Sequence, residues 1–68
     1  MNTAILKGKW KQMSGSAKEK WGKLTDDELR QIDGETERLV GKVQEKYGIG
    51  KDEAQKQVDE WFDKHDTD

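Results

Sequence analysis

The chain has 68 residues and holds one domain at most, near the lower size limit at which a single hydrophobic core stabilises a fold. Only 29% of its residues are apolar, 41% are charged, none is cysteine, and no segment approaches the roughly 18 apolar residues needed to cross a bilayer. This composition excludes a disulfide-stapled secreted domain, a thiolate zinc site and a transmembrane protein, and it predicts a cytoplasmic location.

The first predicted helix carries one apolar stripe. Its apolar side chains recur every three or four residues, the spacing of one face of an α-helix: Leu6, Trp10, Met13, Ala17, Trp21 and Leu24. Gly8 and Gly15 lie opposite this stripe, where each costs a helix about 1 kcal/mol relative to alanine. They indicate either flexible points or a contact outside the core, and the sequence leaves open whether the helix is continuous through them.

Three further helices follow at short intervals. Thr25, with Glu28 three residues on, forms a capping-box pattern and predicts a short second helix that ends near Asp33. A third helix is predicted from the helical spacing of its apolar residues, Leu39, Val40, Val43 and Tyr47. A fourth helix, over about 51–65, is predicted from the same spacing of Ala54, Val58, Trp61, Phe62 and His65. The predicted fold class is therefore all-α, a small four-helix bundle-like domain made of two helical hairpins. Its predicted core is Leu6, Trp10, Met13, Trp21, Leu29, Ile32, Leu39, Val43, Tyr47, Val58 and Trp61.

The glycines indicate an internal repeat of 26 residues. Six of the seven stand at positions 8, 15 and 22 and again at 34, 41 and 48, and in the same register Leu6 aligns with Ile32 and Trp21 with Tyr47. We interpret this as a duplicated helical hairpin within a single domain over residues 1–68, with repeat 1 at about 1–26 and repeat 2 at about 27–52. Gly22 and Gly48 follow the last aromatic residue of each repeat, so both are predicted to end a helix in the left-handed conformation.

Four stretches of the chain together resemble a known family. They are residues 6–12 (LKGKWKQ), 18–27 (KEKWGKLTDD), 39–48 (LVGKVQEKYG) and 54–58 (AQKQV). In their order they are similar to the CsbD-like family of small bacterial general-stress proteins, and the resemblance covers nearly the whole chain. It implies a small helical protein of the bacterial cytoplasm that is produced during general stress or stationary phase. It implies no catalytic or ligand-binding residues.

The charges of the chain are unevenly placed. Residues 1–24 hold six lysines and one glutamate, for +5, while residues 25–68 carry −7. Either the two halves attract each other, or the basic half is a binding arm. Around the first helix, lysines line both edges of the stripe and two tryptophans lie within it, so the candidate polyanion-binding residues are Lys7, Lys9, Lys11, Lys18, Lys20, Trp10 and Trp21. Such a helix either binds an anionic membrane or nucleic-acid phosphates, or it turns its stripe into the core and leaves the lysines as a solvated rim.

Catalytic, metal and cofactor sites are not predicted. The single histidine, His65, and the two serines form no pattern of nucleophile and base, and the acidic tail around it has no recognisable ligand spacing. We expect a non-enzymatic protein without a cofactor or a small-molecule substrate. Three alternatives stay open for its action: a hydrophilic protectant without a specific partner, a module that binds nucleic acid or anionic lipid, and a protein-interaction or self-associating module. The expected oligomeric state is a monomer or weak self-association.

Overall fold

The computed structural model describes the backbone of residues 3–66 and the side chains of residues 5–64. This part of the chain consists of four helices without a strand: α1 (Thr3–Lys20), α2 (Asp26–Ile32), α3 (Thr36–Tyr47) and α4 (Lys51–Asp66). The predicted all-α class and the four helices are confirmed, and the predicted range of the last helix differs by one residue. The side chain of His65 lies outside the described residues.

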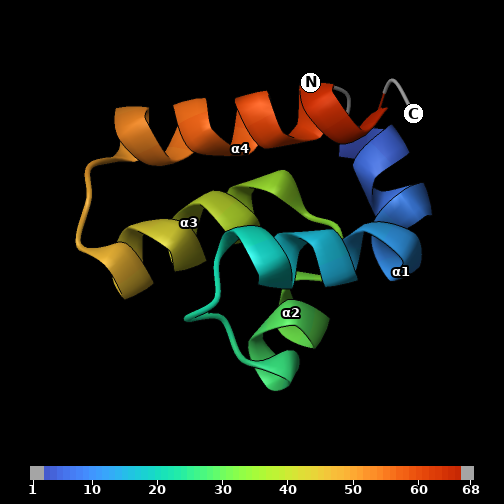
Figure 1. Ribbon diagram of the computed structural model, residues 1–68, viewed down its shortest axis with the longest axis horizontal. Coiled ribbons are helices and arrows are strands. Elements are labelled where there is room, and N and C mark those ends of the chain that lie inside the picture. The colour runs from blue at the N-terminus through green and yellow to red at the C-terminus, as the bar shows by residue number, and fades with distance from the viewer. Residues whose placement is uncertain (1–2, 67–68) are drawn as a thin grey trace.

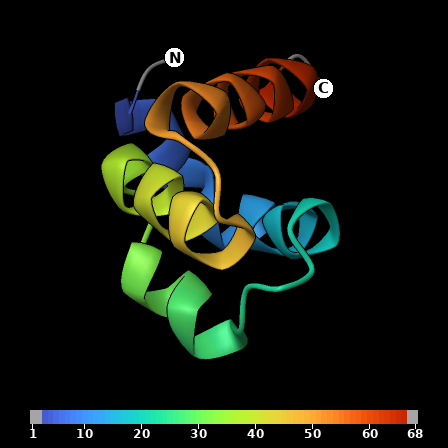
Figure 2. The same cartoon turned by 90° about the vertical axis from the view of Figure 1, so that its left-hand side faces the viewer.

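The helices are arranged around a shared interior. Figures 1 and 2 place α4 along one side of the molecule and α2 on the opposite side, with α3 and the second half of α1 between them. The chain runs along α3 and returns along α4, so these two helices form an antiparallel pair. Because α4 also packs against α1, the last helix connects both halves of the chain.

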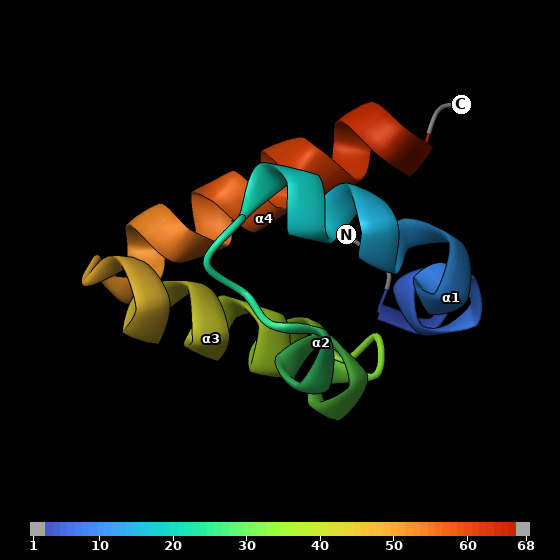
Figure 3. The ribbon, with the colours of Figure 1, turned by 60° about the horizontal axis from the view of Figure 1, so that its bottom comes forward.

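Helix α1 is continuous through both of its glycines, which answers the question that the sequence left open. Its axis nevertheless turns within its first half: Figure 3 looks nearly along the first part of α1 and across the later part. Bends in helices without proline usually occur at glycine and serine residues, and Gly8 lies in this half. The bend lets one helix pack its start and its end in different directions.

Two of the three predicted helix ends follow the local chemistry of their residues, and the third does not. The capping box predicted at α2 is present, since the Glu28 backbone N–H donates to the Thr25 hydroxyl and the Thr25 N–H donates to the Glu28 carboxylate. Gly48 ends α3 in the left-handed conformation with a φ of 63°, as predicted. The prediction for Gly22 is wrong, because its φ is not positive. The last helical bond runs from the Trp21 N–H to the Ala17 carbonyl at 2.8 Å, and the Leu24 N–H then donates to the Trp21 carbonyl at 3.0 Å, so a turn over residues 21–24 follows the helix without a left-handed glycine.

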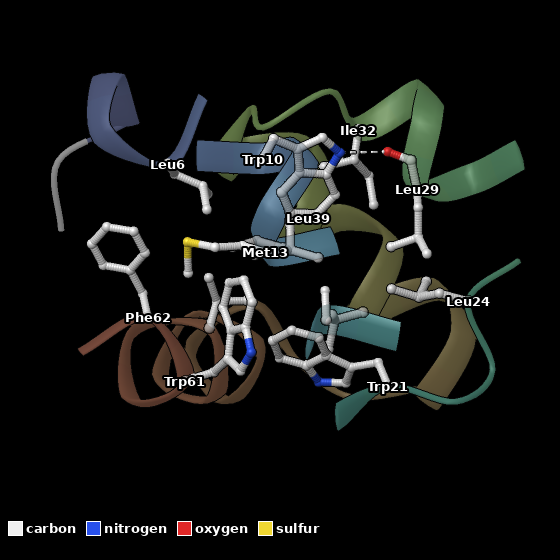
Figure 4. Packing of buried hydrophobic residues seen from close by; sticks show 14 of the residues in the cluster. Leu6, Trp10, Met13, Trp21, Leu24, Leu29, Ile32, Leu39, Trp61 and Phe62 are labelled. Atoms are coloured by element: carbon white, nitrogen blue, oxygen red, sulfur yellow. Dashed lines mark hydrogen bonds between the residues drawn. The ribbon is translucent and has the colours of Figure 1, made fainter. Parts of the chain in front are cut away.

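The core is one cluster of side chains from all four helices (Figure 4). It confirms the predicted residues apart from Tyr47, which is half-buried, and it adds five that were not in the predicted core: Ala17, Leu24, Val40, Ala54 and Phe62. Trp21 and Trp61 meet edge to face with ring centroids 5.3 Å apart. Since edge-to-face aromatic pairs add to the energy of burial, this contact joins the end of α1 firmly to α4.

The corner between α2 and α3 fits tightly against α1. Asp33 ends α2 in the left-handed conformation and Gly34 follows with a φ of 77°. A Cβ atom at Gly34 would stand 2.5 Å from the Cα atom of Lys7. Glycine is therefore required here twice, for its backbone angles and for the close approach of two backbones.

Candidate polyanion interface

The candidate lysines all lie on the outside of α1. Lys7, Lys9, Lys11, Lys18 and Lys20 are exposed, and Glu19 is the one acidic residue within this helix. The apolar stripe lies between the two rows that these lysines form, Lys7, Lys11 and Lys18 along one edge and Lys9 and Lys20 along the other, and it is turned into the core. The helix therefore presents a strongly basic surface, which we call the α1 lysine face and define by these five lysines.

Two of these lysines form ion pairs with the acidic half of the chain. The Lys7 ammonium lies 2.9 Å from the Glu35 carboxylate, and the Lys18 ammonium lies 2.6 Å from that of Asp26. The hydrogen bond from Lys7 lowers the pKa of Glu35, and the one from Lys18 lowers the pKa of Asp26. These contacts agree with attraction between the two halves. Because all four side chains are more than 40% exposed, the pairs add little stability and leave the lysines within reach of solvent.

The two candidate tryptophans are part of the core and not of the surface. Trp10 is 7% exposed and Trp21 is 1% exposed. The Trp10 indole N–H donates to the Leu29 carbonyl at 2.9 Å, and that of Trp21 donates to the Gln57 side chain at 3.1 Å. Both indoles thereby tie α1 to other helices. The structure does not bring them together with the lysines on one accessible face.

A groove of about 570 Å³ runs between α1 and α2. Lys7 and Lys11 line it from α1 and Arg30 from α2, with Asp26 and Asp33 as its acidic members. Arg30 is also paired with Asp27 on its own helix. Sequence reasoning missed Arg30 as a neighbour of the lysine face, because only the packing of α2 against α1 brings it there.

A second groove, of about 740 Å³, lies on the other side of α2, between α2 and α3. Its cations are Arg30, Arg38 and Lys42. Arg38 donates to the Gln31 carbonyl at 3.0 Å, and the Lys42 ammonium lies 3.7 Å from the Glu28 carboxylate. Arg38 and Lys42 therefore connect α3 to α2.

Glu28 is the best-shielded carboxylate among the described ion pairs, with a side chain that is 12% exposed. The Lys46 ammonium lies 2.9 Å from one of its oxygens, and the Thr25 N–H donates to the other. The hydrogen bond from Lys46, followed by that from Thr25, lowers the pKa of Glu28 from 4.5 to about 2. This carboxylate joins the start of α2 to the end of α3, and it has a structural role.

Residues 5–64 contain no group of three or more histidine, cysteine or acidic side chains that could hold a metal ion. Ser14 donates its hydroxyl hydrogen to the Lys11 carbonyl of its own helix at 3.3 Å. No helix in the described part of the chain has the length and apolar character that a membrane span requires. The lysine face and the grooves beside α2 are thus the features that suggest a binding role.

Comparison with known proteins gives a consistent result. The family model described as CsbD-like matches residues 4–56. A UPF0337 protein of Bordetella pertussis is 54% identical over 65 residues, which cover 96% of this chain and 98% of the relative. The UPF0337 protein YjbJ of Escherichia coli is 53% identical over 66 residues, covering 97% and 96% of the two chains. A UPF0337 protein of Pectobacterium atrosepticum is 52% identical over 65 residues, covering 96% and 94%.

Proposed function

The chain belongs to the CsbD-like family of stress-response proteins, and from that premise we propose that it is a non-enzymatic cytoplasmic protein that binds polyanions through the α1 lysine face. The observation that supports this function is the charge of α1: five exposed lysines stand against one glutamate, in a chain whose net charge is −2. A phosphate-bearing polymer is attracted to such a face, and binding releases the counterions that the polymer had condensed.

The buried tryptophans favour binding by charge over insertion into a lipid surface. An interfacial helix binds membranes by placing its apolar face among the acyl chains, and in this fold that face is already in the core. Ile5 is the one large apolar side chain exposed among the residues whose side chains are described. A polymer with many phosphates is therefore a better partner than an anionic membrane.

The ion pairs of Lys7 and Lys18 do not prevent this function. Both pairs are exposed, so a phosphate group can replace Glu35 or Asp26 as the partner at little cost. Lys11 and Lys20 form no ion pair with the residues that the structure describes. Binding is expected to be independent of the nucleotide sequence of the polymer and to weaken strongly as the salt concentration rises.

The test is fluorescence anisotropy of a labelled DNA duplex titrated with the protein. If four lysines contact phosphates, affinity should fall about 100-fold between about 50 and about 200 mM salt. The variant Lys9→Glu/Lys11→Glu/Lys20→Glu should lose most of the binding. Its control, Lys51→Glu/Lys56→Glu/Lys64→Glu in α4, changes the net charge equally and should lose much less. Equal loss in both variants, or no binding at low salt, would refute the proposal.

A further inference from the structure

The aromatic side chains narrow the class of polyanion that fits the proposed function. The chain has three tryptophans, one tyrosine and one phenylalanine, and the structure describes all five. Four of them are buried, with exposed fractions of 7% or less: Trp10, Trp21, Trp61 and Phe62. The fifth, Tyr47, is half-buried and has the Lys23 ammonium 5.1 Å from its ring centroid. Proteins that bind single strands without sequence preference stack the bases on exposed rings, and this surface offers none.

The indoles next to the lysine face are also fixed in place. Figure 4 shows the Trp10 side chain directed inward, with its hydrogen bond to Leu29 of α2. Trp21 is held by Gln57 and by the edge-to-face contact with Trp61. Turning either ring outward would break these contacts and open the core. Bases are therefore not expected to add to binding.

The groove between α1 and α2 offers cations on both of its walls. Lys7 and Lys11 stand on one wall and Arg30 on the other. The whole molecule measures 29 × 24 × 18 Å, so a nucleic-acid duplex is about as wide as the protein and reaches only the rim of this groove. A single flexible chain can lie inside it, where its phosphates meet ammonium and guanidinium groups together.

We propose that the preferred ligand is a linear phosphate polymer without bases, an inorganic polyphosphate chain, bound by charge in the groove between α1 and α2. This inference rests on the proposed function, because two lysines of the α1 lysine face, Lys7 and Lys11, line the groove. Asp26 and Asp33 line the groove as well and oppose the binding of phosphate. Asp26 is already paired with Lys18, so Asp33 is the acid whose removal should matter most.

The first experiment asks whether bases contribute. Three competitors with the same number of phosphates are tested against the labelled duplex at about 50 mM salt: polyphosphate, a thymidine oligonucleotide and an abasic oligonucleotide. We expect polyphosphate to compete best and the two oligonucleotides to compete equally. If the thymidine oligonucleotide competes about tenfold better than the abasic one, bases stack on the protein and the inference is overturned. If the duplex itself does not bind, the proposed function fails instead.

The second experiment asks whether the groove is the site, with polyphosphate as the probe. Arg30→Gln should weaken binding about two- to fivefold, the size expected for one exposed charge pair. Asp33→Asn should strengthen binding by a similar factor, and asparagine accepts the left-handed conformation of this position. The controls are Lys56→Gln and Asp63→Asn in α4, on the far side of the molecule. If the changes in α4 have effects as large as those in the groove, the site is not there.

Discussion

Gly8 and Gly34 align with each other in the proposed 26-residue repeat, yet the backbone has a different conformation at the two positions. Gly8 lies inside the continuous helix α1, and a Cβ atom there would meet nothing within 4 Å. Gly34 lies in a left-handed corner between two helices, against the backbone of Lys7. The first half is thus one bent helix, and the second half is two helices.

The residue before each glycine explains the difference. Asp33 precedes Gly34, and aspartate is a weak helix former that accepts the left-handed conformation. Lys7 precedes Gly8, and lysine is a good helix former without that tolerance. Glycine permits a break in both halves, but its neighbour and the packing of the corner against α1 decide whether the break occurs.

The largest effect is expected at Trp21, which aligns with Tyr47 in the proposed register. Trp21→Ala should cost about 3–5 kcal/mol in the free energy of unfolding, because a buried ring and its contact with Trp61 are lost. Tyr47→Phe removes only the hydroxyl that accepts a hydrogen bond from the Lys23 N–H, and it should cost about 0.5–1.5 kcal/mol. Urea unfolding followed by circular dichroism measures both. Similar losses would mean that the two positions are equivalent after all.

A smaller effect separates the glycines themselves. Gly48→Ala should cost about 1–2 kcal/mol for its positive φ alone, since nothing lies near its Cβ position. Gly34→Ala should cost more, because the methyl group also meets the Lys7 backbone. Gly15→Ala, in an open part of α1, should raise stability by up to about 1 kcal/mol. Thermal unfolding of the three variants gives their order, and a neutral Gly34→Ala would contradict the tight corner.

The smallest effect is a pH dependence located in the second half. The pKa of Glu28 is lower in the folded chain, so its stabilising contribution is complete above about pH 4.5 and is lost as the pH falls toward about 2. Glu28→Gln should lower the unfolding temperature at pH 7 and have little effect near pH 2. Glu45→Gln, at a carboxylate that is 67% exposed, is the control and should matter less at both values. If Glu28→Gln lowers the unfolding temperature equally at pH 7 and near pH 2, the stabilising effect of Glu28 does not come from its charge.

Local patterns in the sequence predict most of this fold. The spacing of apolar residues gave the helices and most of the core, and the capping box at Thr25 was predicted because it depends on residues three positions apart. The end of α1 was missed because it depends on the packing of Trp21 and on the hydrogen bond from Lys23 to Tyr47, which holds the following loop. These contacts join residues far apart in the chain.

The candidate interface could be predicted only in part. The lysines of α1 were placed correctly outside the stripe, because charged residues at the edges of a core-facing stripe extend into solvent. Whether the Trp10 side chain faces the core or a ligand could not be predicted, because an apolar stripe has the same helical spacing in both cases. Lys7 forms its ion pair with Glu35, which is 28 residues away in the chain. Arg30 lines the groove beside Lys7 only because α2 packs against α1.

The contact between Trp21 and Trp61 also gives the molecule a built-in optical signal. Two indoles with centroids 5.3 Å apart and planes inclined by 63° couple their electronic transitions, which produces a paired positive and negative band in circular dichroism. That band depends on α1 and α4 remaining docked. A ligand that touches only the outer lysines would leave the band unchanged, whereas one that separates these helices would abolish it.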